Sequence, residues 1–102
     1  MSKNSNMKLN ALEQQIGLTK AIKQYKRNIS QNSDEDNAFE RLAVIYRSRN
    51  QIENEIRVSK KAIAFYENAV FAEHLESMLP MLNQFTKTLK TAQSLLSSQQ
   101  NG

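Results

Sequence analysis

The sequence predicts an all-α fold, and three observations lead to that prediction. Glycine occurs twice and proline once in 102 residues, whereas folds rich in strands need the many turns that these residues provide. Apolar residues recur every three or four positions, which is the period of a helix. Polar segments interrupt this pattern at residues 30–34 and near Asn50. We therefore expect two helical hairpins, at residues 7–35 and 36–69, and a long C-terminal helix at 70–96.

The first hairpin follows a polar N-terminus, residues 1–6, which has no apolar anchor and is expected to be disordered. Gly17 separates its two helices. The apolar positions on either side have helical spacing, namely Leu9, Leu12 and Ile16 before the glycine and Leu18, Ile22, Tyr25 and Ile29 after it. The segment Ser30–Asp34 has no apolar residue and is expected to be a loop.

The second hairpin is expected to begin near Asn37, with Asp34 or Asp36 as the residue that caps its first helix. The pattern of the first helix includes Phe39, Leu42, Ala43, Ile45 and Tyr46, and that of the second helix includes Ile52, Ile56, Ile63, Tyr66 and Val70. No residue that breaks a helix follows until Pro80, so the next helix is expected to continue directly.

The C-terminal third carries a heptad stripe with alternating spacings of four and three. Its members are Phe71, Leu75, Met78, Leu82, Phe85, Leu89, Ala92 and Leu96. Pro80 falls at the outermost heptad position, where it need not enter the stripe, and we expect a kink or a break of the helix near Leu79. The helix either folds back on its own chain or pairs with a second copy, and the unbroken register favours a homodimer. Residues 97–102 are expected to be a disordered polar tail.

Two segments 34 residues apart, 22–29 and 56–63, agree in residue type at most positions, three of them basic. Leu42, Ala43 and Tyr46 stand at corresponding positions of a helix–turn–helix repeat with that period. The chain therefore resembles the tetratricopeptide repeats, with a partial repeat at 7–35 and a full one at 36–69. The resemblance implies a concave surface that binds a peptide or a helix. Its residues here are Asn37, Glu40, Arg41, Val44, Arg47 and Ser48.

The repeated bases are expected to form a basic ridge. Its members are Lys23, Lys26 and Arg27 in the first segment and Arg57, Lys60 and Lys61 in the second. With a net charge of +4, such a ridge fits an acidic protein or nucleic acid, and it equally fits a solvated surface that keeps the chain soluble. The sequence leaves both interpretations open.

Catalytic and metal-binding patterns are lacking in the sequence. Cysteine is absent, His74 is the only histidine, and Asp34-Glu35-Asp36 lacks the ligand spacing of a calcium loop. We expect no enzyme activity, metal or cofactor. No run of about 18 apolar residues and no signal peptide is found, so we expect a cytoplasmic protein. The predicted function is a protein–protein interaction module, an adaptor or small chaperone-like protein. The alternative is a small basic accessory protein that binds nucleic acid.

Overall fold

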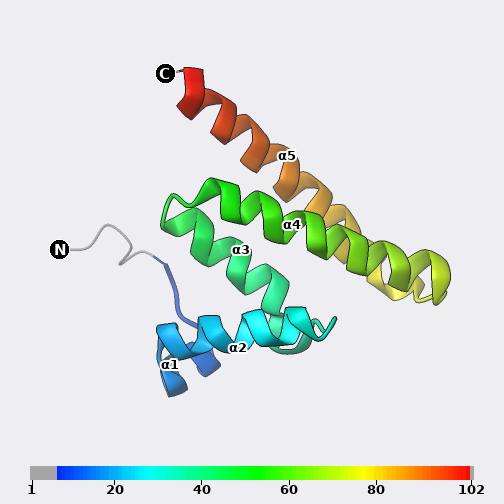
Figure 1. Cartoon of the computed structure of the whole chain (residues 1–102). Coiled ribbons are helices and arrows are strands. Elements are labelled where there is room, and N and C mark those ends of the chain that lie inside the picture. Colours follow the sequence, from blue (N-terminus) through cyan, green and yellow to red (C-terminus); the bar gives the residue numbers. More distant parts are fainter. Residues whose placement is uncertain (1–6, 102) are drawn as a thin grey trace. The chain divides into compact units, whose positions relative to one another are not determined.

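The computed structural model describes residues 7–101, and these residues form helices and turns without any strand (Figure 1). The helices are α1 (Ala11–Ile16), α2 (Leu18–Ser30), α3 (Ala38–Ser48), α4 (Ile52–Glu67) and α5 (Leu79–Asn101). A π-helical turn, Asn68–Ala72, extends α4, and 3₁₀ turns at Glu35–Asn37 and Glu76–Met78 precede α3 and α5. The predicted all-α class and the long last helix are confirmed. The chain divides into two compact units after Asn50.

In the N-terminal unit, Gly17 separates α1 from α2 as the sequence predicts. Its φ of 89° is a backbone conformation that side chains rarely adopt. The amide of Gly17 donates to the Glu13 carbonyl at 2.9 Å, and the amide of Ala21 donates to the Gly17 carbonyl at 2.9 Å. One residue therefore ends one helix and begins the next, and α1 and α2 pack against each other.

The loop before α3 differs from the prediction. Neither Asp34 nor Asn37, the residues that precede its 3₁₀ turn and α3, makes a side-chain capping bond. The Asp36 carboxylate instead accepts a hydrogen bond from Nδ2 of Asn28 at 3.1 Å, and the same amide donates to the Glu35 carbonyl at 3.0 Å. Buried Asn28, on α2, thus holds the loop at Glu35 and Asp36. The carboxylate of Asp36 serves this contact, and not the helix capping that the sequence predicted.

Helices α2 and α3 pack together in the N-terminal unit. Their buried apolar side chains are Ala21 and Tyr25 on α2 and Ala38, Phe39, Leu42, Ala43 and Ile45 on α3. The spacings follow the period of a helix, so each helix buries one stripe. Asn50, with φ of 58°, ends this unit in the left-handed conformation that asparagine tolerates well. The predicted reset of the pattern at Asn50 is confirmed.

In the C-terminal unit, the predicted continuous helix from residue 70 is wrong. The chain leaves the helix at residues 73–75, where His74 has φ of 58°. The amides of Glu73 and Leu75 donate to the carbonyls of Asn68 and Ala69, which satisfies the exposed end of the preceding turn. Pro80 lies in the first turn of α5, where its missing amide proton has no partner to lose.

The heptad stripe is split by this turn. Helix α5 packs against α4, and Leu82, Phe85 and Ala92 are buried. Leu89, Leu96 and Met78 are half-buried, whereas Phe71 and Leu75 are exposed. The rings of Phe85 and Tyr66 stack with their centroids 5.8 Å apart. The chain therefore folds back, and α4 covers the apolar residues of α5 that were predicted to pair with a second copy. Dimerisation stays a prediction.

Two further predictions concern segment boundaries. Helix α5 continues to Asn101, so the predicted disordered tail from Ser97 is wrong for the described residues. Serine and glutamine do not stop a helix that has already formed, because adding a residue is far easier than starting a helix. The predicted disorder of residues 1–6 lies outside the described residues. The division after Asn50 falls inside the predicted hairpin 36–69, and the tetratricopeptide resemblance stays a prediction.

Candidate functional site

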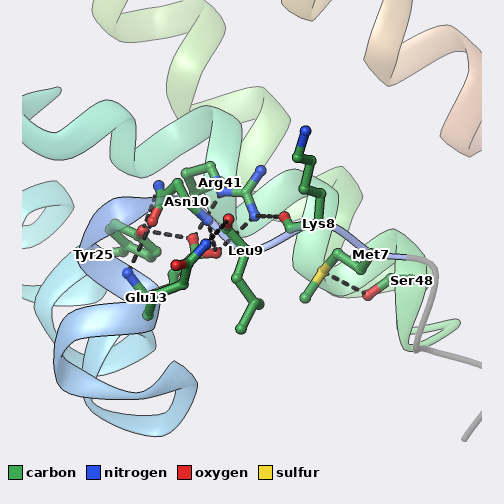
Figure 2. Close-up of polar contacts among 9 residues, drawn as sticks. Met7, Lys8, Leu9, Asn10, Glu13, Tyr25, Arg41 and Ser48 are labelled. Atoms are coloured by element: carbon green, nitrogen blue, oxygen red, sulfur yellow. Dashed lines mark hydrogen bonds and ion pairs between the residues drawn. The ribbon is translucent and has the colours of Figure 1, made fainter.

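The most connected polar cluster lies in the N-terminal unit around Glu13, which is 1% exposed (Figure 2). Its Oε2 accepts hydrogen bonds from the Tyr25 hydroxyl at 2.6 Å and from Arg41 Nε at 2.7 Å. Its Oε1 accepts from Arg41 Nη2 at 2.8 Å and from the Asn10 amide at 3.1 Å. The carboxylate therefore joins α1, α2 and α3 through four donors.

The environment of these groups shifts their pKa values. Burial raises the pKa of Glu13, but the hydrogen bonds from Arg41, Tyr25 and the Asn10 amide, with the charge of Arg41, outweigh it and lower the pKa below the usual value. Burial and the bond to Glu13 raise the pKa of Tyr25. The bond to Glu13 raises the pKa of Arg41. Glu13 and Arg41 are therefore charged and Tyr25 is neutral near neutral pH.

The same cluster fixes the first described residues, Met7–Asn10, against α3 (Figure 2). Arg41 Nη2 donates to the Lys8 carbonyl at 3.1 Å. The Ser48 hydroxyl donates to the Ile45 carbonyl at 2.8 Å and lies 3.3 Å from the sulfur of Met7. Arg41 and Ser48, both predicted to bind a partner, are thus used within the chain. The cluster has the character of a structural clamp.

Sequence reasoning missed Glu13, although one signal pointed to it. Asn10 and Glu13 form a capping box, in which the Asn10 side chain accepts from the Glu13 amide at 2.9 Å and Glu13 accepts from the Asn10 amide. An Asn followed by Glu three positions later is the recognised pattern for this box. The pattern does not reveal that Arg41, 28 residues further on, also binds that carboxylate.

Three of the other predicted partner-binding residues lie on one side of α3. Glu40, Val44 and Arg47 are spaced by four and three residues, which places them on one helix face. Asn37 precedes the helix, with a left-handed backbone at φ of 54°. Val44 is 39% exposed and is the large apolar side chain at the centre of this set. The structure therefore brings Glu40, Val44 and Arg47 together on α3 and leaves Asn37 outside the helix.

The predicted basic ridge falls on two helices in different units. Lys23, Lys26 and Arg27 are exposed on α2, and Arg57, Lys60 and Lys61 are exposed on α4. Arg57 donates to the Asn54 side chain at 2.9 Å. Helix α2 also exposes Lys20 and has no acidic residue. Each group of three bases therefore lies on the solvent-exposed surface of a single helix.

A third surface includes Phe71 and Leu75, which were predicted to lie in a dimer or capping seam. Phe71, Leu75 and Leu79 are exposed by 68%, 45% and 42%. Phe71 lies in the π-helical turn, Leu75 directly precedes the 3₁₀ turn Glu76–Met78, and Leu79 is the first residue of α5. The π-helical turn contacts the 3₁₀ turn. The sequence assigned Phe71 and Leu75 to a buried seam because their heptad spacing continued. We call these three residues the turn cluster.

Comparisons with protein families, with curated proteins and with solved structures find no match to this chain. Within residues 7–101, no three acidic or histidine side chains are grouped as they would be to hold a metal ion. None of the described helices has the length and apolar character needed to cross a membrane.

Proposed function

We propose that the chain is a non-enzymatic protein–protein interaction module, an adaptor or small chaperone-like protein. The observation that carries this proposal is the turn cluster, three large apolar side chains exposed within nine residues. Single exposed apolar residues are common on soluble proteins, whereas a group of them at one place is typical of a binding surface. Phenylalanine, the aromatic residue of this group, is enriched at protein–protein interfaces.

The energetic argument for a partner follows from the exposed fractions. Full burial of a leucine or phenylalanine contributes about 1.5–3 kcal/mol. Because the turn cluster is roughly half exposed, covering it would contribute about 4 kcal/mol before the losses of association. This amount is large enough for one side-chain substitution to change affinity measurably.

The exposed side of α3 is a second contact region in this proposal. Asn37, Glu40, Val44 and Arg47 stand where a tetratricopeptide-like surface would bind a peptide or a helix. Val44 supports the idea because it is apolar, central and 39% exposed. Arg41 takes no direct part, since its guanidinium is bound to Glu13 at 2.7 and 2.8 Å.

Affinity capture with three matched forms of the chain tests the proposal. We expect the wild type and Leu95→Ser to retain the same protein, and Phe71→Ser to lose it. Leu95 is the control because it is also a large apolar residue, 37% exposed, in the same unit. Equal capture by all three forms would exclude the turn cluster as the site. Failure of the wild type to bind any protein in its native cell extract would contradict the function.

One observation favours the alternative function, binding of nucleic acid. Helix α2 exposes four bases, Lys20, Lys23, Lys26 and Arg27, without an acid among its 13 residues. Contacts of such bases to phosphates would make the affinity fall steeply as salt rises. Tyr25, the aromatic residue among them, is fully buried and cannot stack on a base. Tight binding of random DNA that Lys23→Glu and Arg27→Glu abolish would favour this alternative.

A further inference from the structure

We infer that the turn cluster docks a basic amphipathic helix of another protein. This inference rests on the proposed function and adds the chemistry of the partner. The cluster is surrounded in the chain by exposed carboxylates, those of Glu67, Glu73 and Glu76. No lysine or arginine occurs from residue 62 to residue 86. The surface is therefore both apolar and negative, although the whole chain carries a net charge of +4.

The negative charge comes from these side chains and not from the backbone. The cluster lies where α4 and its π-helical turn end and α5 begins, and the partial charges at the C-terminus of one helix and the N-terminus of the next have opposite signs. Charged groups on the elements packed there do not cancel the negative charge of the glutamates. The first basic residue of α5 is Lys87, two turns beyond Leu79, and Lys61 lies more than one turn before Glu67. A cationic ligand is attracted from solution by such a field, and an anionic one is repelled.

The same charges argue against a second copy of this chain. A two-fold dimer through the cluster would place the carboxylates of Glu73 and Glu76 next to their own equivalents, and like charges at an interface are unfavourable. The chain's basic helices do not fit the cluster either. The other large apolar side chains exposed among the described residues are Val44 and Leu95, neither of which lies on α2 or α4.

An amphipathic helix combines what the surface requires. Its apolar residues, three or four positions apart, would cover Phe71, Leu75 and Leu79, and its lysine or arginine residues would face the three glutamates. An extended apolar segment would meet the side chains but leave the carboxylates without a partner. Nucleic acid would be repelled by them. The partner we infer is therefore a helical protein segment with an apolar face and positively charged residues along the edges of that face.

A designed peptide of leucine and lysine with helical spacing provides the probe, and matched leucine–glutamine and leucine–glutamate peptides provide the comparison. Fluorescence anisotropy with the full chain measures their affinities at low and high salt. We expect the lysine peptide to bind most tightly and to weaken as salt rises. Phe71→Ser is expected to lower its affinity on the order of tenfold, whereas Leu95→Ser leaves it unchanged.

The carboxylates are tested separately from the apolar residues. The double substitution Glu73→Gln and Glu76→Gln is expected to lower the affinity for the lysine peptide several-fold, to reduce its salt dependence, and to leave the glutamine peptide unchanged. Glu53→Gln, an exposed carboxylate in the first turn of α4, is the control. A circular dichroism spectrum for each variant confirms that it is folded.

Each result has a defined meaning. Equal, Phe71-dependent binding of the lysine and glutamine peptides would overturn the basic partner and leave the proposed function intact. Binding that Phe71→Ser does not affect would overturn the docking site itself. Concentration-dependent self-association of the wild type, abolished by Phe71→Ser in light scattering, would show that a second copy occupies the cluster and would overturn the inference. Failure of the proposed function is detected independently by affinity capture.

Discussion

The two units of the chain are stabilised by different chemistry. In residues 7–50, a buried carboxylate accepts four hydrogen bonds and joins three helices. In residues 51–101, α4 and α5 form a hairpin with mainly apolar and aromatic side chains at its centre, where Tyr66 and Phe85 stack, although α4 also buries Glu55. A buried ion pair is sensitive to the loss of either partner. An apolar core is sensitive mainly to changes in volume.

This difference determines where each unit is expected to be vulnerable. The N-terminal unit needs specific donors, in specific positions, for one carboxylate. The C-terminal unit needs filled volume between two helices, and any polar group buried there without a partner lowers its stability. Hydrogen exchange measured on peptides from each unit follows the two separately, so substitutions can test the comparison.

The largest effect is expected from Phe85→Ala. Phe85 is 1% exposed and stacks on Tyr66, so its removal leaves a cavity between α4 and α5. Such substitutions cost about 3–5 kcal/mol. We expect hydrogen exchange to accelerate in α4 and α5 well before it changes in α2 and α3. Equal acceleration in both units would show that they unfold together and would remove the basis of the comparison.

A smaller loss, about 2–3 kcal/mol, is expected from Arg41→Ala, because the variant leaves the Glu13 carboxylate buried without its cation. Because the side chain of Arg41 is 17% exposed, the loss of stability is expected to be smaller than for a fully buried ion pair. Exchange should accelerate in α1, α2 and α3. Arg49→Ala is the matched control, since Arg49 is exposed, and it should change stability by less than about 0.5 kcal/mol. Equal effects of the two variants would contradict the role of the clamp.

Acid is expected to weaken the same unit more gently. The pKa of Glu13 is lowered by folding from its ordinary value of 4.5, so its contribution is complete above that pH and is lost as the pH falls through the folded value. Thermal melting of the wild type and Glu13→Gln at neutral and acidic pH measures this contribution. The difference between them should shrink in acid. A constant difference would show that the charge of Glu13 does not stabilise the fold.

The sequence predicted the helical periodicity well, because local spacing alone decides it. Gly17 and Asn50 were also correctly identified as breaks, since both adopt positive φ. The turn at residues 73–75 was missed because the heptad spacing continued across it, and because the residue with φ of 58° is a histidine and not one of the glycine, proline or asparagine residues that usually indicate a turn. The bond from Arg41 to Glu13 could not be predicted, since it joins residues 28 positions apart and depends on how the helices pack.

The smallest effect is expected at Ser59, in α4. Ser59 is fully buried, and its hydroxyl has no hydrogen-bond partner among the described residues. Ser59→Ala removes this unpaired group and introduces a better helix former, so we expect a gain of about 1 kcal/mol. Ser94→Ala, at an exposed position of α5, should gain only the helix-propensity part, about 0.5 kcal/mol.

The difference between these two variants in thermal melting isolates the buried hydroxyl. If Ser59→Ala raises the melting temperature more than Ser94→Ala does, an apolar atom is more stable than a hydroxyl at this buried position of the α4–α5 hairpin. If Ser59→Ala instead lowers the melting temperature below that of Ser94→Ala, the hydroxyl makes a stabilising hydrogen bond, for example to the carbonyl of the preceding turn. The C-terminal unit would then have a stabilising polar contact at Ser59 in addition to the buried carboxylate of Glu55, and the two units would differ only in degree.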